Sequence, residues 1–197
     1  MRSVLLLLVG LGVTAPALPS YSQSSGAPVA PAMTTSQRTE ALDKLFEELR
    51  RERREMAAER IASRIRDKWL DSGSASIDAM MQWSQEAVDA KKYGVALDFL
   101  DRITVLLPDY AEGWNRRATV HFLMNSYRKS MADIDRTLRL EPRHFGALAG
   151  MGSILKQSGR KQLALDAYER ALAIYPMMRS AQKEVAELSE ELAGEGI

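Results

Sequence analysis

Two histidines, His121 and His144, are the side chains best suited to proton transfer or metal binding in this chain. Metal ligands that share one helix are about four residues apart, and these two histidines are not spaced in that way. A structural metal site also needs about four clustered ligands, and the chain contains no cysteine. The sequence therefore predicts no metal site, no disulfide and no thiolate chemistry.

Nucleophilic catalysis and phosphate binding have equally weak support. The serines considered as nucleophiles are Ser84, Ser130 and Ser153. None of them lies within a histidine–acid pattern, and the sequence contains no G-x-S-x-G motif. The glycines at positions 146, 150 and 152 fall inside a helical pattern, which favours close helix packing over a nucleotide-binding loop. Carboxylates are abundant, but no pair is marked out for acid–base work. We expect no catalytic residues and no cofactor, so the protein is predicted not to be an enzyme.

Composition gives no indication of a nucleic-acid or membrane partner. The net charge of +1 over 197 residues gives no reason to expect nucleic acid or an anionic membrane as the main partner. The run Arg50–Arg54 is interleaved with glutamate and is typical of a solvated helix face. An acidic or membrane-surface contact is the alternative for that run.

Residues 1–22 are typical of a secretory signal peptide. Arg2 precedes an apolar run from Val4 to Val13, and small residues around Ser22 offer a cleavage site. A spanning helix would need about 20 apolar residues, which is longer than this run. We therefore expect export to the periplasm or medium, with no stable membrane insertion after cleavage. Residues 23–36 are rich in Ser, Ala and Pro and are predicted to form a flexible leader.

Three prolines, Pro108, Pro142 and Pro176, are 34 residues apart in succession. Such a fixed period indicates stacked structural repeats. With these prolines near the end of each unit, the units are 77–110, 111–144 and 145–178. No segment from residue 37 onward alternates with a period of two, so we expect an all-α protein.

The repeats resemble those of the tetratricopeptide-repeat family, in particular its exported bacterial members. That family prefers certain residues at positions 4, 7, 8, 11, 20, 24, 27 and 32 of a 34-residue helix–turn–helix unit. The third unit is the best match, with Leu148, Met151, Gly152, Leu155, Ala164, Tyr168, Ala171 and Pro176 at these positions. The second unit departs from the pattern at Arg117, His121 and Thr137. The resemblance implies a right-handed α-solenoid that binds other proteins or peptides.

Particular positions carry packing expectations. Positions 8 and 20 are small in each unit, as at Gly152, which lets two helices approach closely. Trp114 at position 4 is expected to be buried between the first and second units. Asn125 and Gly159, at position 15, are expected to adopt a left-handed conformation where the chain leaves a first helix.

Segments on either side of the three units complete the solenoid. Residues 37–76 are predicted to form a degenerate helical hairpin, in which residues 43–76 would be a fourth unit in register. The alternative is one long charged helix. Residues 179–197 are predicted to form a capping helix and tail that cover the last unit, with glutamates facing water.

The resemblance also implies a concave groove lined by the first helix of each unit. Here the corresponding positions are Met81, Gln82, Gln85, Glu112, Asn115, Arg116, Thr119, Phe122, Lys156 and Gln157. Some family members clamp a terminal carboxylate with Lys at position 5 and Asn at position 9, and that pair is absent. We expect an adaptor or scaffold of the cell envelope that binds another protein or a peptide segment. The alternatives are a self-assembling homo-oligomer and an accessory subunit of an envelope enzyme complex.

Overall fold

The structure is a computed structural model that describes residues 35–194; the expected signal peptide and most of the leader lie outside this range. The described part is helical and contains α1 (Thr35–Arg51), α2 (Glu55–Leu70), α3 (Ala75–Asp89), α4 (Tyr93–Leu106), α5 (Ala111–Leu123), α6 (Tyr127–Leu140), α7 (Phe145–Gln157), α8 (Lys161–Ile174) and α9 (Arg179–Gly194). Among these helices, none is both long enough and apolar enough to cross a membrane.

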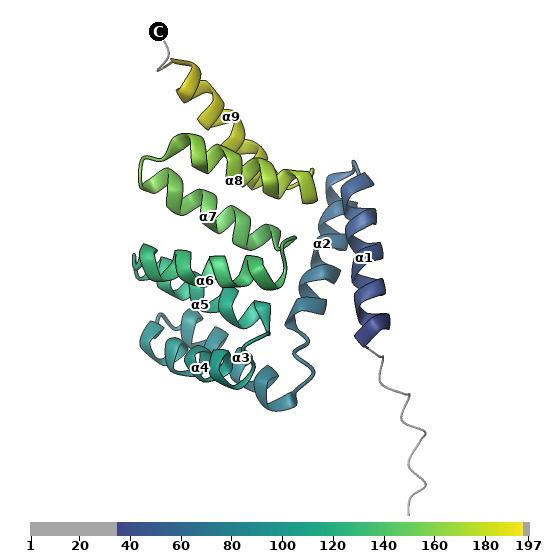
Figure 1. Cartoon of the computed structure of the whole chain (residues 1–197), viewed down its shortest axis with the longest axis vertical. Coiled ribbons are helices and arrows are strands. Elements are labelled where there is room, and N and C mark those ends of the chain that lie inside the picture. The colour runs from purple at the N-terminus through teal and green to yellow at the C-terminus, as the bar shows by residue number, and fades with distance from the viewer. Residues whose placement is uncertain (1–34, 195–197) are drawn as a thin grey trace, which may run out of the picture. The chain divides into compact units, whose positions relative to one another are not determined.

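Three helix pairs, α3–α4, α5–α6 and α7–α8, stack one after another, and α9 packs on the last pair (Figure 1). The prediction of an α-solenoid is confirmed. Small residues at the crossing points are buried, as at Ala96, Ala118 and Ala164. Gly152 is buried against α8, where a Cβ atom would lie only 2.8 Å from the ring of Tyr168. Helices approach this closely only where side chains are absent or short.

The turn inside each helix pair uses a residue with a positive φ angle. Asn125 has φ of 55° and Gly159 has φ of 71°, which confirms the left-handed conformation expected at both positions. Lys91 occupies the same place in the first pair with φ of 57°. In all three turns, the residue after the one with positive φ donates its backbone N–H to the carbonyl five residues earlier, as Ser126 does to His121.

The second helix of each pair ends just before its proline. The capping residues Leu107, Glu141 and Tyr175 leave the helical conformation, with ψ angles of 72°, 93° and 81°. This is the behaviour expected of a residue close to a proline, which has no N–H to continue the ladder and disfavours helix just before itself.

The segment 37–76 forms two helices instead of one long helix. The break at residues 52–54 is stabilised by Glu52, whose carboxylate accepts hydrogen bonds from the backbone N–H groups of Arg53 and Arg54. The hydrogen bonds from the side chain and backbone of Arg54 lower the pKa of Glu52 to about 2. The arginine-rich run therefore contains a turn, although it has none of the usual turn residues.

The α1–α2 hairpin does not stack on α3–α4 as a fourth unit in register would. It lies along the side of the solenoid where the proline turns are, next to α5 and α8 (Figure 1). Trp69 of α2 stacks on His144 with ring centroids 4.1 Å apart, and it also contacts Phe145 at 5.1 Å. The hairpin packs here because the proline turns carry aromatic rings, and the apolar stripes of α1 and α2 remove these rings from water.

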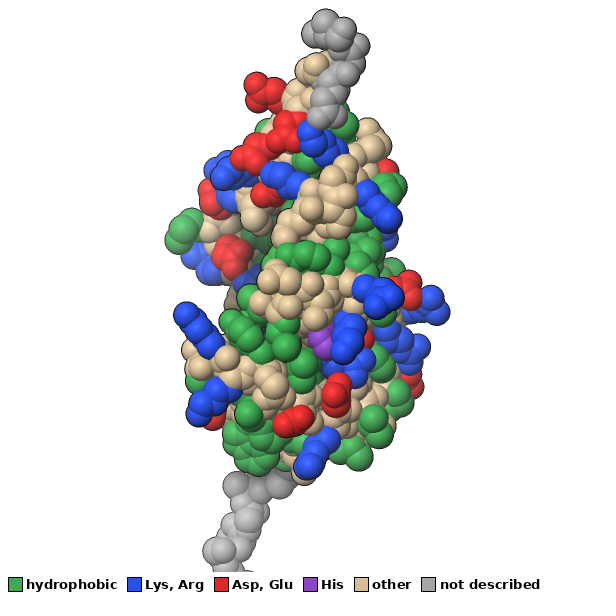
Figure 2. All heavy atoms as spheres, turned by 90° about the vertical axis from the view of Figure 1, so that its left-hand side faces the viewer, with side chains coloured by type: hydrophobic (Ala, Val, Ile, Leu, Met, Phe, Trp, Pro, Cys, Tyr) green, Lys and Arg blue, Asp and Glu red, His purple; other side chains and the backbone are tan. Residues whose placement is uncertain are grey.

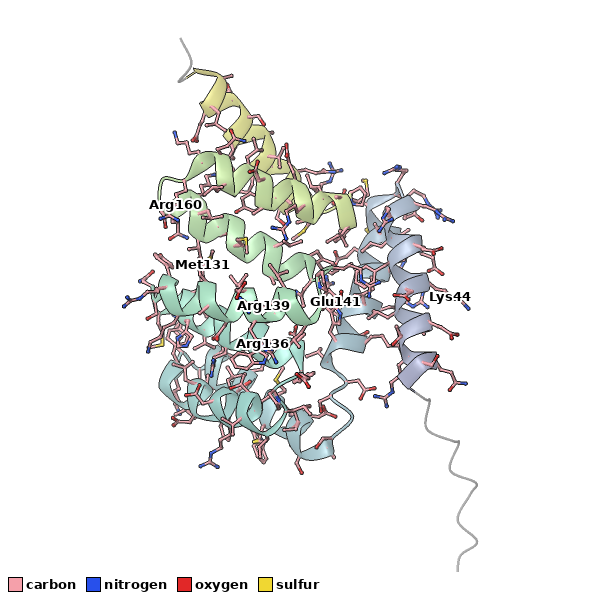
Figure 3. The ribbon with its side chains drawn as sticks, viewed as in Figure 1. Lys44, Met131, Arg136, Arg139, Glu141 and Arg160 are labelled. Atoms are coloured by element: carbon pink, nitrogen blue, oxygen red, sulfur yellow. The ribbon has the colours of Figure 1, made fainter. Side chains whose placement is uncertain are left out.

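Polar contacts hold the same hairpin in place. Arg143 donates to Asp43 of α1 at 2.6 Å and to Glu141 at 2.9 Å. The Tyr175 hydroxyl donates to Glu59 of α2 at 2.9 Å. In Figure 3, Glu141 lies on the side of the solenoid that faces the hairpin, whereas Arg160 lies on the opposite side. The hairpin therefore lies along the second and third repeats, and the end of α2 at Leu70 also touches the first repeat, which remains at the end of the stack.

Candidate functional site

A hollow of about 150 Å³ opens between α5 and α7, the first helices of the second and third repeats. Its walls come from these two helices and its floor from α6. The lining residues are Asn115, Ala118, Thr119, Phe122, Ser130, Ile134, Gly146, Ala147, Gly150 and Ser153.

The hollow exists because one face of α7 lacks bulk. Gly146, Gly150 and Ser153 are spaced at i, i+4 and i+7, so they share a face of the helix. A Cβ atom at position 150 would make ordinary contact with Ile134 at 3.6 Å, so a small side chain there would meet no obstacle. Phe122 stands at the wall and is held against Tyr127 with ring centroids 5.6 Å apart.

Three of the residues predicted to line a groove do line this hollow: Asn115, Thr119 and Phe122. Thr119 is exposed, and its hydroxyl donates to the backbone carbonyl of Asn115 at 3.0 Å. The amide N–H of Asn115 donates to Glu112 at 3.0 Å, which orients the side chain. These three side chains come from successive turns of one packed helix, so their positions are set before any partner arrives.

Two predicted groove residues are buried, which corrects the expectation that they face a partner. Met81 is 6% exposed and belongs to the core shared with Leu100 and Ile103. Glu112 is 7% exposed and accepts hydrogen bonds from Arg116 at 2.7 Å and from His144 at 3.0 Å. In both cases the side chain turns toward a neighbouring element of the protein.

The Glu112–His144 pair is a buried polar cluster near the hollow. His144 is the N-cap of α7, and its Nδ1 accepts the N–H of Ala147 at 3.0 Å. The ring proton must then be on Nε2, which donates to Glu112. Burial opposes ionisation of Glu112, but the hydrogen bond from His144 and the charge and hydrogen bond of Arg116 outweigh burial and lower the pKa of the Glu112 carboxyl. Trp69 covers the imidazole, so this pair links the hairpin to two repeats.

The remaining predicted residues make contacts within the protein. Lys156 donates to Glu184 at 2.6 Å and to Glu187 at 3.0 Å, and these hydrogen bonds raise its pKa. Two glutamates of α9 that were expected to face water therefore hold α7. The other partners follow the same pattern: Gln82 with Glu86, Gln85 with Asp89 and Arg116, and Gln157 with Tyr127.

Trp114 is not buried between the first two repeats as expected. Its ring is half-buried, and its indole N–H donates to the carbonyl of Pro108 at 2.9 Å. The guanidinium of Arg117 lies 4.7 Å from the ring centroid, and that of Arg136 lies 5.9 Å away. An indole can place its apolar face under cations and its N–H at a turn, so it is stable at this edge.

The hydroxyl groups of the candidate serines form hydrogen bonds within the protein. The hydroxyl of Ser84 donates to the carbonyl of Met81 at 2.7 Å, and that of Ser130 donates to the carbonyl of Ala118 at 2.8 Å. Ser153 pairs with the hydroxyl of Tyr168 at 2.9 Å. Within residues 35–194, no group of three or more His, Asp or Glu side chains could hold a metal ion.

Comparison with known proteins agrees with this architecture. No protein-family model matches the chain. A TPR repeat-containing protein of Rhizobium etli is 56% identical over 153 residues, which are 78% of this chain and 75% of the relative. The small glutamine-rich tetratricopeptide repeat-containing protein 2 of Mycosarcoma maydis is 25% identical over 123 residues, 62% of this chain and 35% of that protein.

Solved structures with the same fold are more distant in sequence. The first TPR of Spaghetti (RPAP3), bound to an HSP90 peptide, superposes with a TM-score of 0.57 at 20% identity, over 59% of this chain and 93% of that chain. The structure of MamA gives a TM-score of 0.56 at 18% identity, over 70% and 81% of the two chains. The stacked helix pairs, their 34-residue period and the extensive identity to the Rhizobium etli relative lead to one conclusion: the chain belongs to the tetratricopeptide-repeat family.

Proposed function

We propose that the protein is a non-catalytic binding module that takes up a peptide segment of another protein in the groove between α5 and α7. The observation that carries this proposal is the hollow of about 150 Å³, which combines an apolar floor with polar side chains at its edge. Its size suits one aliphatic or small aromatic side chain of the partner.

The expected energetics favour such an anchor. Burying a side chain such as Leu, Met or Phe contributes about 1.5–3 kcal/mol. The walls belong to packed helices, so little ordering cost offsets this gain. Asn115 and Thr119 at the edge offer polar groups for the peptide backbone beside the anchor.

Two solved neighbours support a peptide as the class of partner. The first TPR of Spaghetti (RPAP3) was solved with an HSP90 peptide, and the TPR2B domain of yeast Sti1 was solved in a complex with pHsp70. The carboxylate clamp expected for a terminal peptide is missing here, since positions 5 and 9 of the second repeat are Asn115 and Thr119. The proposed ligand is therefore an internal segment recognised by an apolar side chain.

We place this activity in the cell envelope, where the protein would act as an adaptor or scaffold. Arg2, the apolar run Val4–Val13 and the small residues before Gln23 support export. N-terminal sequencing of protein from the native host should begin near Gln23. An intact Met1 on cytosolic protein would contradict export and leave the groove proposal standing.

Filling the hollow tests the groove directly. Gly150→Leu places a side chain where the partner's anchor would sit, and the position has room for a Cβ atom. Gly94→Leu is the matched control, because Gly94 lies in α4 with no heavy atom within 4 Å of its Cβ position. After crosslinking in the cell envelope, Gly150→Leu should lose the partners retrieved by the wild-type protein, and Gly94→Leu should keep them. Equal retrieval by both variants would show that the hollow is not the binding surface.

A further inference from the structure

The first repeat carries an aromatic pair at the end of the stack. Trp83 of α3 is 49% exposed, and its ring centroid lies 5.6 Å from that of Phe99 in α4. Val95 and Leu106 are on the same stripe of α4 as Phe99 and are 46% and 64% exposed. Large apolar side chains that gather on an exposed face indicate an interaction surface.

The other two repeats show what this face is built to contact. Arg117 and Asp133 occupy in the second repeat the places of Trp83 and Phe99, each 34 residues later. Arg117 bonds to Asp133 at 2.7 Å and reaches the preceding helix α4, where it bonds to Asp101 at 2.8 Å. In the second repeat, helix α4 of the preceding repeat therefore covers the face on which these two positions lie.

The third repeat follows the same rule with apolar side chains. Met151 and Ala167 occupy the two positions there. Ala167 is 2% exposed, and Met151 packs against a cluster that includes Ile134 of the preceding helix α6. For the first repeat, the preceding hairpin α1–α2 packs along the proline turns instead, so within residues 35–194 no earlier helix pair stacks over Trp83 and Phe99.

The two ends of the solenoid differ in character. The outer side of α9 is rich in charge, with Lys183 paired to Glu187 at 3.6 Å and with Glu190 and Glu191 exposed. Figure 2 shows basic and acidic side chains crowded together at the α9 end, whereas at the α3–α4 end patches of hydrophobic side chains lie between scattered charged ones. Head-to-tail stacking would place the aromatic pair against these charges and desolvate them, which is unfavourable.

We propose that a second copy of this chain docks on the α3–α4 end, so that the Trp83–Phe99 pair of each copy covers that of the other. The contact is a two-fold one, in which the same surface meets itself and closes the assembly at two copies. This proposal is independent of the peptide groove, which lies between α5 and α7.

The oligomeric state of the purified protein tests the proposal. Sedimentation velocity over a range of concentrations should show a dimer that dissociates on dilution. The double variant Trp83→Arg/Phe99→Asp gives the first repeat the same ion pair that Arg117 and Asp133 form at these positions in the second repeat, so the variant should fold. We expect it to raise the dissociation constant by at least about 100-fold, because aromatic anchors are the usual hot spots of interfaces. The matched control is Leu163→Asp, which replaces another exposed apolar residue (51%) on α8; it should remain dimeric.

A wild-type protein that is monomeric at every concentration would overturn the proposal, as would a double variant that still forms dimers. Crosslinking then tests the two-fold geometry, which is simple because the chain has no cysteine. Arg102→Cys, on the stripe between Phe99 and Leu106, should crosslink to itself with a short bis-maleimide, whereas Ser189→Cys on α9 should not. Crosslinks that form only when the two variants are mixed would indicate head-to-tail stacking and overturn the two-fold contact.

Discussion

Two glycines on the same helix should respond differently to replacement by alanine, because only one of them has room for the added methyl group. A Cβ atom at Gly152 would lie 2.8 Å from Cε2 and Cζ of Tyr168, inside the limit of van der Waals contact. That ring cannot move away easily, because Tyr168 is 4% exposed and its hydroxyl bonds to Ser153. At Gly150 the added atom would make only an ordinary contact, at 3.6 Å from Ile134.

The magnitude follows from two contributions. Replacing glycine by alanine in a helix gains about 1 kcal/mol from backbone conformational preference, and this gain is the same at both positions. Overpacking costs about 1–3 kcal/mol and applies only at Gly152. The free energy of unfolding of Gly152→Ala should therefore be about 1–3 kcal/mol below that of Gly150→Ala, and Gly150→Ala should be more stable than the wild-type protein.

Urea unfolding followed by circular dichroism measures both variants under one set of conditions. Gly152→Leu should be less stable still, because the larger side chain also has to displace Tyr168. If Gly152→Ala and Gly150→Ala unfold at the same urea concentration, the close approach of α7 and α8 is wrong.

Three further perturbations test other parts of the structure. Trp69→Ala should cost about 3–5 kcal/mol in urea unfolding, because the ring is 9% exposed and joins the hairpin to the repeats; a cost under about 1 kcal/mol would mean that the hairpin is not docked. Arg117→Met should cost about 3–5 kcal/mol by removing the guanidinium that pairs with the buried Asp133, and adding Asp133→Ala should restore most of that stability; a double variant as unstable as the single one would contradict this. Burial lowers the pKa of His121 below 6.5, so the unfolded chain binds a proton that the folded chain does not. Stability should then fall as the pH drops through 6.5 toward the folded pKa, and His121→Gln should flatten that part of the profile.

The features that repeat along the sequence could be predicted, and those that occur once could not. The three prolines and the small residues at the helix crossings recur with a fixed period, so the helix pairs and turns follow from them. The stacking of Trp69 on His144 joins segments 75 residues apart, and this contact occurs once, so the 34-residue period does not predict it. That is why the hairpin was expected in register with the repeats and is found beside them.

The candidate site was predicted in part for a similar reason. Repeat position identifies the helix face, which placed Asn115, Thr119 and Phe122 at the hollow. It does not identify the partner of a charged side chain, so Glu112 was expected in the groove although it is buried against His144. The helical pattern around Gly146 and Gly150 predicts close helix packing, whereas their spacing of four residues indicates the open helix face that the structure shows.

The central claim is that the groove between α5 and α7 holds a peptide segment of another protein. A photo-crosslinking amino acid at Thr119, which is exposed at the edge of the hollow, tests this most directly in the native host. The same probe at Leu163, which is 51% exposed on α8, is the control for general surface contact. We predict a discrete crosslinked partner from position 119 that is absent from position 163 and disappears when Gly150→Leu is added. Crosslinks of equal yield from both positions, or none from position 119, would contradict the account.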